Sequence, residues 1–309
     1  MSGAAEPLVS IGLPVRNGEH YLAEAVRSVL DQAYGRIELV ISDNASDDGT
    51  EEICRQFAES DARIRYHRQP QNIGLVPNFN AVLQLAEGTY VKWMGDDDWL
   101  TPTYVSRCVE VLDDDTTLIL VTTRQAHVDP GGAVASAGYD GARMRSASPV
   151  ERFAEMLWLL NESHLLLDPL YGMMRRARIV RLPRPIMLFE DEIFAARLAL
   201  AGPFGHLDEV LSYRRSRPFP RLVATARRLG VPPWQARLAT TLQCRELVAA
   251  VRELDLTPRE RRQASAAVTR MFLRRKRLTA THRGRKLGGL VSQTLARPRS
   301  LAPTASEGH

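Results

Sequence analysis

The sequence predicts an α/β fold with a mainly parallel central sheet flanked by helices, followed by a carboxyl-terminal α-helical extension. Over the first hundred residues, short apolar and β-branched runs alternate with helical stretches, the order of parallel strands joined by crossover helices. Polar turns rich in Asp, Asn and Gly follow the predicted strands, at the edge where open α/β sheets bind ligands. After residue 216 the strand signals end and Arg-rich helical sequence begins.

The first elements follow from their apolar patterns. LVSIGLPV at 8–15 is a continuous apolar run, as in a strand buried on both faces. Apolar residues at three- and four-residue spacing from Leu22 to Leu30 predict the next helix. IELVIS at 37–42 is the second strand. The turn at 43–50 holds Ser46, Asp47 and Asp48 as candidate caps for a helix that begins near Thr50.

The same alternation continues as far as residue 215. We expect a strand at 64–69, a loop and then a helix over 72–88 that ends at Gly88, and a strand at 89–94 that runs directly into GDDDWLTP. The later elements are a strand at 118–123, a Pro-Gly turn at 128–132, an irregular loop at 138–149, a helix at 150–160, a strand at 170–176, a helix at 189–202 and a strand at 206–215.

Composition excludes several classes of protein. With 44% hydrophobic and 25% charged residues, the chain is neither collagen-like nor disordered. It has no apolar run of the roughly 18 residues that a membrane-spanning helix needs, and MSGAAEPLVS lacks the features of a secretory signal. Its three cysteines are scattered and odd in number, which does not predict a disulfide framework. We therefore expect a cytoplasmic protein with free thiols.

The net charge of +5 divides unevenly along the chain. Residues 1–215 hold 21 Lys and Arg against 31 Asp and Glu, a net −10, whereas residues 216–309 hold 20 against 5, a net +15. Such a division indicates two tasks. We expect an acidic domain at 1–215, a basic amphipathic helical region at 216–292 and a disordered tail at 293–309.

Three acidic clusters fall where strands end or helices begin: Asp43, Asp96–Asp98 and Glu190–Glu192. Each alone has a plain structural interpretation as a helix cap or a solvated loop. Three adjacent carboxylates nevertheless repel one another unless a cation or strong donors compensate them. Mg²⁺ or Mn²⁺ needs only one or two protein carboxylates beside phosphate oxygens. Because neither GxxxxGK[ST] nor GxGxxG is present, a P-loop NTPase and a Rossmann dehydrogenase are disfavoured.

Four segments, taken in order, resemble the family 2 glycosyltransferases, which have the Rossmann-like GT-A fold. SIGLPVRNGEHYLAEAVRSVLDQ resembles the opening strand of that family, and ELVISDNASDDGT resembles its base-binding turn. GTYVKWMGDDDWLTP resembles its metal-binding DxD segment. LFEDEIFAARLALAG, followed by HLDEVLSYR, resembles its ED segment and the strand after it. The resemblance covers residues 7–215.

The resemblance implies a role for individual residues. It implies nucleotide-sugar contacts from Pro14, Val15, Arg16, Asn17, Asp43, Asn44, Asn72, Gly74, Asn78 and Asp96, with Asp43 accepting a hydrogen bond from the base. It implies that Asp97 is the main ligand of a divalent metal, Mn²⁺ or Mg²⁺, with Asp98 in support. Asp191 would be the general base, and Glu190 would hold or tune it.

Several positions depart from the family pattern. Gly95 stands where many relatives have the first Asp of DxD, and Ser216 stands where many have a histidine, so metal ligation depends more heavily on Asp97. Arg16 replaces a common tyrosine, and Pro77 replaces an arginine. His164 is a candidate substitute on the acceptor or phosphate side, although a lone histidine is more often structural.

The implied reaction is an inverting transfer of a hexosyl or deoxyhexosyl group from a UDP- or dTDP-type sugar to a hydroxyl acceptor. We expect a lipid-linked or cell-envelope glycan, or a glycolipid, as the acceptor. A nucleotidyltransferase is one alternative, although LPVRNGEH lacks the Gly-rich basic loop expected of that class. The other alternative is a non-catalytic relative that binds a nucleotide or a surface.

Residues 259–286 form a basic amphipathic stretch with three alternative roles. It resembles helices that bind anionic lipid, which would place the protein peripherally at the inner face of the membrane. It could instead pack on the acidic domain or between protomers. Nucleic-acid binding is the least favoured role, because no reading motif and few aromatic residues accompany the charge.

Overall fold

The computed structural model describes residues 6–163, 165–216 and 221–295, with side chains placed as far as Leu278. Its strands are β1 Val9–Val15, β2 Ile37–Asp43, β3 Ile64–Arg68, β4 Tyr90–Trp93, β5 Trp99–Leu100, β6 Leu120–Val128, β7 Val134–Ala135, β8 Met173–Arg175 and β9 Phe204–Arg215. Its α-helices are α1 Leu22–Leu30, α2 Thr50–Ser60, α3 Leu75–Leu85, α4 Tyr104–Asp114, α5 Pro149–Glu162, α6 Arg176–Ile179, α7 Glu190–Ala201, α8 Leu222–Arg228, α9 Gln235–Arg252 and α10 Pro258–Leu295. Two 3₁₀ turns, η1 Ala142–Arg145 and η2 Pro169–Tyr171, lie between them.

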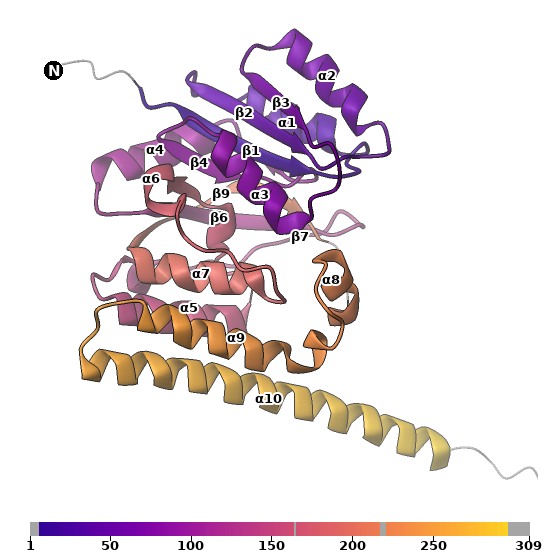
Figure 1. Cartoon of the computed structure of the whole chain (residues 1–309), viewed down its shortest axis with the longest axis vertical. Coiled ribbons are helices and arrows are strands. Elements are labelled where there is room, and N and C mark those ends of the chain that lie inside the picture. The colour runs from indigo at the N-terminus through magenta and orange to yellow at the C-terminus, as the bar shows by residue number, and fades with distance from the viewer. Residues whose placement is uncertain (1–5, 164, 217–220, 296–309) are drawn as a thin grey trace, which may run out of the picture.

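The strands in the described residues form one sheet in the order β3-β2-β1-β4-β8-β6-β9-β5, with β7 paired to β6. The long pairings, β1 with β2, β3 with β2, β4 with β1 and β9 with β6, are parallel. The antiparallel pairings, at β5, β7 and β8, join two residue pairs each. The predicted α/β class is therefore confirmed, with a curled sheet between helices (Figure 1).

Strand register brings the polar turns together. Val15 pairs with Asp43, and Asp43 pairs with Arg68, so the carboxyl ends of β1, β2 and β3 lie in line. β4 pairs with the first part of β1, from Val9 opposite Tyr90 to Gly12 opposite Trp93, and the chain then enters the acidic triplet on the same edge. The turns after β1, β2 and β4 therefore meet at one edge of the sheet, as the sequence predicts.

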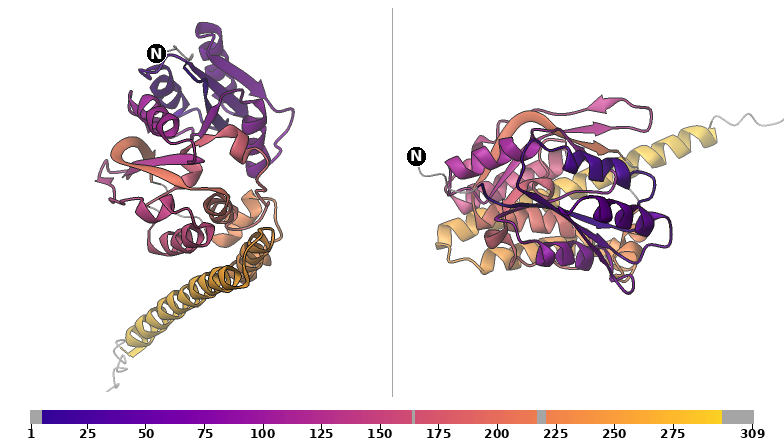
Figure 2. Two further views of the ribbon diagram at one scale, coloured as in Figure 1. Left: turned by 90° about the vertical axis from the view of Figure 1, so that its left-hand side faces the viewer. Right: turned by 90° about the horizontal axis from the view of Figure 1, so that it is seen from above.

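Helices cover both faces of the sheet. One apolar core joins the sheet to α1, α2 and α4, and a second joins its other face to α3, α5 and α7. A third core lies between α5, α7, α9 and α10, and includes Leu247, Val268 and Met271. Figures 1 and 2 show these helices stacked below the sheet, with the carboxyl-terminal part of α10 extending past the other elements.

The carboxyl-terminal helices therefore share a core with the domain that we expected at 1–215. α10 has 38 residues and ends at Leu295, three residues beyond the expected boundary at 292; residues 296–309 lie outside the described part. Among the expected roles of 259–286, packing on the domain is observed for the first turns of α10. No helix among the described residues is long and apolar enough to span a membrane.

Several elements differ from the sequence-based expectations, and α6 and the two-residue strands β5 and β7 were not predicted. Helix α4 was not predicted, although Val105, Cys108, Val109 and Leu112 have helical spacing and are buried. Helix α3 ends at Leu85 instead of Gly88. A Cβ at Gly88 would lie 2.7 Å from Ser10 N and from Tyr90 O. This glycine therefore permits close contact between backbone segments rather than ending a helix.

Candidate active site

The loops after β1 and β2 are locked together by hydrogen bonds. Asn17 N donates to Ser46 Oγ (3.0 Å), and Asp47 N donates to Asn17 Oδ1 (3.1 Å). Asn17 and Ala45 have φ values of 57° and 54°. Non-glycine residues rarely adopt this left-handed conformation, which is often found at functional sites. The interlocked loops therefore form a rigid rim at the end of the sheet.

Asp43 lies under this rim and is fully buried. Its Oδ1 accepts hydrogen bonds from Ser46 N (2.9 Å) and Ser46 Oγ (2.5 Å). Its Oδ2 accepts hydrogen bonds from Tyr66 Oη (3.0 Å) and from a guanidinium nitrogen of Arg68 (2.6 Å). Because both oxygens are bonded within the protein, Asp43 orders the turn and fixes the half-buried Arg68 beside it in this conformation.

The turn at 72–74 is held in the same manner. Asn44 Nδ2 donates to Asn72 Oδ1 (2.9 Å), and Ile73 N donates to Asn44 Oδ1 (2.7 Å). Gly74, at a φ of 92°, begins α3. Asn78, one turn further along α3, is buried and bonds both Ser42 O (2.9 Å) and Ser42 Oγ (2.7 Å). Asn78 therefore ties α3 to β2 behind the turn.

The acidic triplet lies in the loop between β4 and β5. Asp96 and Asp97 are partly exposed, whereas Asp98 is buried. A Cβ at Gly95 would lie 2.9 Å from Asp98 Oδ2 and 3.1 Å from Asp97 Oδ1. A Cβ at Gly18 would likewise lie 2.9 Å from Asp96 Oδ2. Two glycines therefore leave the space in which these carboxylates lie.

Positively charged side chains from β9 and β4 lie near the acidic triplet and compensate its negative charge. Arg214 Nε lies 3.4 Å from Asp98 Oδ2, and Arg215 donates to Asp97 O (2.8 Å) from between the rings of Tyr21 and Trp99. Lys92 Nζ donates to Tyr171 O (2.5 Å), and burial lowers the pKa of Lys92 to about 8. Burial raises the pKa of Asp98, while Arg214 opposes that shift.

The triplet suits a hard divalent cation only in part. Within the described residues, no three Asp, Glu, His or Cys side chains are grouped so that they could hold a metal ion. Asp97 and Asp96 nevertheless place carboxylates at the partly exposed end of the loop, and Mg²⁺ or Mn²⁺ needs only one or two. The carboxylate of Asp98 already forms an ion pair with Arg214. These residues therefore fit a metal that draws its other ligands from phosphate and water.

The second acidic segment begins α7. Phe189 has a φ of 62°, which turns the chain sharply before Glu190. Glu190 is buried and accepts hydrogen bonds from Arg184 at 2.5 and 3.1 Å. The Arg184 guanidinium also lies 4.5 Å from the centre of the Phe79 ring. Glu190 is thus an anchor inside the protein.

Asp191 points to solvent although protein surrounds it on several sides. Its side chain is exposed, and its Oδ1 accepts a hydrogen bond from Glu192 N (2.9 Å). Desolvation by the surrounding protein raises the pKa of Asp191, Asp168 raises it further, and Arg184 opposes the shift. An exposed carboxylate with a raised pKa is the form expected of a general base.

Arg214 connects the two acidic segments. It contacts Asp98 on one side and donates to Asp168 Oδ2 (2.7 Å) on the other, with its guanidinium 3.9 Å from the centre of the Tyr171 ring. Asp168 in turn raises the pKa of Asp191, so Arg214 is paired with a carboxylate that acts electrostatically on the candidate base.

The segment that carries Asp191, the candidate general base, is also held by a side chain of α10. Arg275 donates to Glu192 Oε2 (2.6 Å), Asn161 Oδ1 (2.9 Å) and Gln243 Oε1 (2.8 Å). Its guanidinium lies 5.2 Å from the centre of the Phe189 ring. One side chain of the carboxyl-terminal helix thereby joins α5, α7 and α9 at the turn that positions Asp191.

The predicted site residues divide into two groups. Those with partly or fully exposed side chains or backbone are Arg16, Asn17, Asn72, Gly74, Asp96, Asp97 and Asp191. Those buried behind them are Pro14, Val15, Asp43, Asn44, Asn78, Asp98 and Glu190. His164 lies outside the described residues. Sequence analysis did not identify Arg68, Arg184 or Arg275, and the position of Arg68 at the end of β3 was the one available signal.

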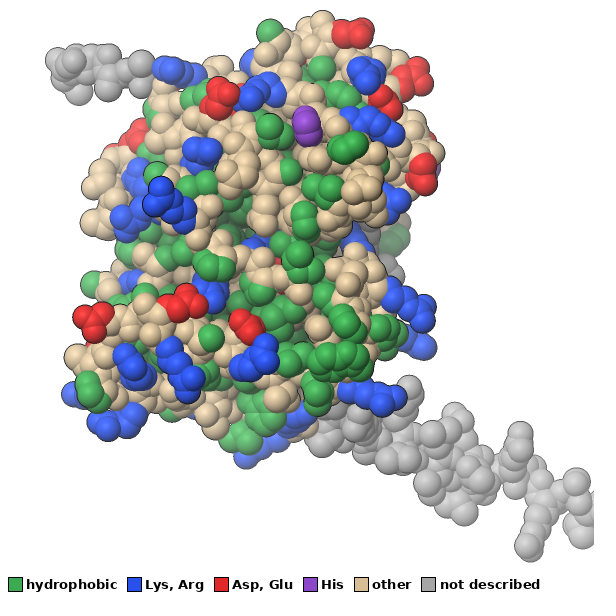
Figure 3. Space-filling model, in the orientation of Figure 1, with side chains coloured by type: hydrophobic (Ala, Val, Ile, Leu, Met, Phe, Trp, Pro, Cys, Tyr) green, Lys and Arg blue, Asp and Glu red, His purple; other side chains and the backbone are tan. Residues whose placement is uncertain are grey.

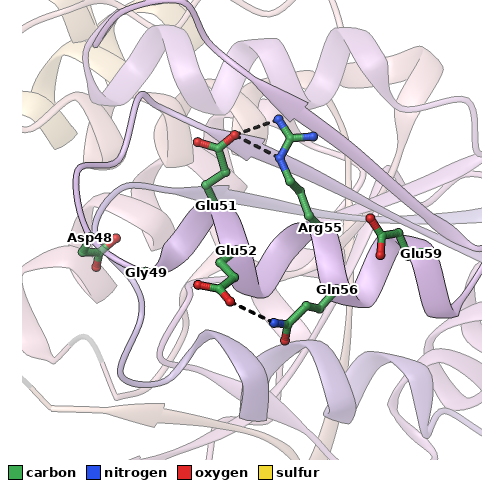
Figure 4. Close-up of a pocket in the computed structure, with 7 residues that line it drawn as sticks. All are labelled: Asp48, Gly49, Glu51, Glu52, Arg55, Gln56 and Glu59. Atoms are coloured by element: carbon green, nitrogen blue, oxygen red, sulfur yellow. Dashed lines mark hydrogen bonds and ion pairs between the residues drawn. The ribbon is translucent and has the colours of Figure 1, made fainter.

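A separate hollow follows α2 and its preceding turn, with a volume of about 560 Å³ (Figure 4). It is lined by Asp48, Gly49, Glu51, Glu52, Arg55, Gln56 and Glu59. Arg55 and Gln56 bond to carboxylates within it. No residue predicted to bind the nucleotide, metal or acceptor lines it. The candidate active site is therefore the edge where β1, β2 and β4 end, together with Asp191 at the start of α7.

Comparison with known proteins gives one family and several similar structures. The family model described as glycosyl transferase family 2 matches residues 10–177. Chondroitin synthase of Pasteurella multocida (strain Pm70) is 33% identical over 134 residues, which are 43% of this chain and 14% of that protein. The chain therefore matches only a small part of that relative's length.

Two solved structures resemble the whole fold. S. aureus TarS 1-349 in complex with UDP has a TM-score of 0.63 at 17% identity, covering 85% of this chain and 70% of that one. The mannosyltransferase PcManGT from Pyrobaculum calidifontis, in complex with GDP-Man and Mn²⁺, has a TM-score of 0.57 at 18% identity, covering 96% and 82%. At these identities the likeness concerns the fold, and it agrees with the GT-A fold implied by the sequence motifs.

Proposed function

The chain belongs to glycosyl transferase family 2, and on that premise we propose that it transfers a sugar from a nucleotide-diphosphate sugar to a hydroxyl acceptor. The observation that supports this most directly is the pairing of two different acidic sites. One is a partly exposed pair, Asp96 and Asp97, beside a rigid polar rim. The other is Asp191, an exposed carboxylate with a raised pKa. A transferase needs both kinds of site.

The donor nucleotide would lie along the rim formed by the turns after β1, β2 and β3. Arg16, Asn17 and Asn72 present exposed polar groups there. Arg68, which Asp43 holds at 2.6 Å, is a further candidate for contact with the base or the phosphates. We propose a UDP- or dTDP-type donor. TarS was solved with UDP and PcManGT with GDP-Man. The identity of the nucleotide base in the donor is therefore to be measured directly.

A divalent metal, Mn²⁺ or Mg²⁺, would be held by Asp97, with Asp96 beside it. Asp98, which lies 3.4 Å from Arg214, would support the loop that presents both carboxylates. When bound, such an ion stabilises the negative charge that develops on the departing nucleoside diphosphate. Arg215 contributes by fixing the backbone carbonyl of Asp97 at 2.8 Å. The loop that presents Asp97 is thereby prevented from relaxing away from the rim.

Asp191 would accept the proton of the acceptor hydroxyl as the new glycosidic bond forms. A hydroxyl is a poor nucleophile at neutral pH, and a carboxylate within hydrogen-bond reach removes that barrier. The oxygen attacks the anomeric carbon, the bond to the diphosphate breaks, and the proton passes to Asp191. A single displacement of this kind inverts the anomeric configuration. Glu190 and Glu192 are bonded to Arg184 and Arg275, so they hold the turn and leave Asp191 as the base.

We propose a hydroxyl of a growing cell-envelope polysaccharide or glycolipid as the acceptor. The chondroitin synthase similarity supports a polysaccharide acceptor. The acceptor would approach from the side of Asp191, at the start of α7.

The proposal is tested by thermal unfolding of the full chain with UDP-, dTDP- and GDP-sugars, each with and without Mn²⁺. We expect one donor to raise the unfolding temperature in a metal-dependent way, because a ligand that binds only the folded state stabilises it. Asp97→Ala should abolish the metal-dependent part. Asp114→Ala, at an exposed position at the end of α4, is the matched control and should behave like the wild type.

Release of the nucleoside diphosphate completes the test. Turnover of the stabilising donor in the presence of a hydroxyl acceptor is the expected result. If no nucleotide sugar changed the unfolding temperature with any metal, the transferase proposal would be wrong and a non-catalytic, surface-binding role would replace it.

A further inference from the structure

Exposed apolar side chains gather on one corner of the molecule. Among the described residues, Leu222, Val223, Trp234 and Leu238 are large hydrophobic residues open to solvent, and all four lie on α8 or at the start of α9. Trp234 is 55% exposed and Leu238 is 48% exposed. Figure 3 shows hydrophobic side chains clustered over this part of the molecule, with Lys and Arg side chains around them. We call these four residues the α8–α9 surface.

The same segment is positively charged and contains no acid. Residues 221–238 include Arg221, Arg227, Arg228 and Arg237 but neither Asp nor Glu. All four arginines are exposed. None of them forms an ion pair with another residue in the part of the chain that the structure describes. An apolar centre with only cations around it is complementary to a surface that is both apolar and anionic.

The inner face of α8 is packed against the protein, and this packing leaves its outer face exposed to solvent. Ala226 and Leu229 pack inward with Leu188 and Val76, and Val231 and Ala239 complete this small core. The helix therefore satisfies its own packing without Leu222 and Val223. Phe189, which lies against the same core, directly precedes Glu190 and Asp191. The α8–α9 surface is thus about one helix diameter, on the order of 10 Å, from the segment that holds the candidate base.

The basic end of α10 reaches the same corner. Arg275 bonds to Gln243, and α9 and α10 run in opposite directions (Figure 1). Residues after Arg275 therefore pass the first turns of α9, where Trp234 and Leu238 lie. Lys276, Arg277 and Leu278 are exposed at this point. Exposed cationic and apolar side chains of three helices therefore lie near this corner.

We propose that the α8–α9 surface binds an anionic lipid bilayer, with Trp234 and Leu238 entering the interface and the arginines contacting lipid phosphates. Tryptophan and leucine flanked by arginine are typical of helices that lie in the membrane interface. Binding through this surface needs no turnover. It would also bring Asp191 close to a lipid-borne hydroxyl, and that consequence alone rests on the proposed function.

The test uses the full chain and vesicles of two compositions, phosphatidylcholine alone and an equal mixture with phosphatidylglycerol. We expect co-sedimentation with the anionic vesicles, weaker binding to the neutral ones and a blue shift of tryptophan emission. Trp234→Gln with Leu238→Gln should weaken vesicle binding by about tenfold or more, because two apolar side chains no longer leave water. Trp158→Gln, which removes an exposed tryptophan on α5, should leave binding unchanged.

The arginines are tested in the same assay. Arg227→Gln with Arg228→Gln should weaken binding to anionic vesicles by about tenfold or more and leave binding to neutral vesicles unchanged, since each cation near an anionic surface adds attraction. Arg178→Gln with Arg181→Gln removes two other exposed charges and is the matched control. Both pairs are exposed, so the unfolding temperature should stay at the wild-type value.

Three results would overturn the proposal. The first is wild-type protein that does not bind anionic vesicles at low salt. The second is equal loss of binding in the Trp158 variant and the Trp234 variant. The third is a self-associating protein, or one that binds an oligonucleotide instead of vesicles, in which the Trp234 and Leu238 changes abolish that association. Donor binding by thermal unfolding is measured separately in solution, so failure here leaves the proposed function untouched.

Discussion

The two halves of the candidate site are built in different ways. We call the turns after β1, β2 and β3 the donor side, and the segment that holds Asp191, the candidate general base, the base side. On the donor side, the polar turns are held by bonds between neighbouring strand ends, such as Asn17 with Ser46, 29 residues apart. On the base side, the turn before Asp191 is held by two arginines, Arg184, which bonds to Glu190 six residues away, and Arg275, which bonds to Glu192 83 residues away. Hydrogen bonds between neighbouring turns shape the donor side, and charged contacts, one of them from α10, shape the base side.

This difference indicates separate functions for the two halves. The donor side is rigid because its hydrogen bonds are completed within a few adjacent turns, so it can bind a nucleotide without rearrangement. The base side depends on packing between α5, α7, α9 and α10, which lie outside the sheet. Changes on the base side should therefore alter rate or stability, and changes on the donor side should alter binding.

The largest effect is expected from Asp191→Asn. The substitution keeps the shape of the side chain but removes its ability to accept the hydroxyl proton, so transfer should fall by about a thousandfold. Donor binding should persist, because Asp191 lies on the base side. Transfer rate and donor-dependent unfolding temperature measure the two quantities separately. Retention of most of the activity would show that another residue is the base.

Arg184→Gln should have the next largest effect, on stability. Arg184 and Glu190 are both buried, and removing the cation leaves a carboxylate without its partner. Breaking a buried pair in this way costs about 3 kcal/mol of unfolding free energy. The double change Arg184→Met with Glu190→Leu should recover most of that loss, as measured by denaturant unfolding. If Arg184→Gln left stability unchanged, the ion pair would not be what anchors the turn.

The sequence predicts the donor side better than the base side for a physical reason. Asp43, Asn72 and the triplet lie in short polar turns directly after strands, so local pattern reveals them. Arg184 and Arg275 are two among 41 Lys and Arg residues, and no local feature distinguishes them from exposed cations. The partners of Arg275 depend on how helices far apart in the chain pack together, whereas Arg184 bonds to Glu190 six residues away, across the turn at Phe189.

The burial of the motif residues could not be predicted from the sequence either. The family resemblance implied that Asp43 and Asn78 are site residues, but it could not show that both are buried and bonded inside the protein. The longer strands and most helices were predicted because their apolar spacing is local, whereas the two-residue strands β5 and β7 were not. Helix α4 was overlooked although Val105, Cys108 and Leu112 gave the required spacing.

Arg275→Gln tests the contribution of α10 to the base side. Its charge is lost beside Glu192 and Phe189, so the turn before Asp191 should loosen, and we expect kcat to fall by about fivefold with KM for the donor unchanged. Arg275→Lys restores the charge but not the branched hydrogen bonds, and should recover only part of the rate. Arg270→Gln, an exposed position on the same helix, is the control. A rise in KM at constant kcat would instead assign Arg275 to binding.

The smallest expected effect is a displacement of the pH profile. Asp191 acts as a base only when ionised, and desolvation by the surrounding protein, together with the charge of Asp168, raises its pKa. Transfer should therefore decline, as pH falls, at a higher pH than an ordinary aspartate would cause. Asp168→Asn removes the neighbouring negative charge and releases Arg214 from its partner. Both changes favour the ionised form of Asp191, so the acid limb of kcat/KM should move to lower pH. Glu59→Gln, on the exposed side of α2, should leave the profile in place. A shift of the Asp168 variant toward higher pH would mean that a group other than Asp191 controls the acid limb, and the base side would then need a different catalytic carboxylate.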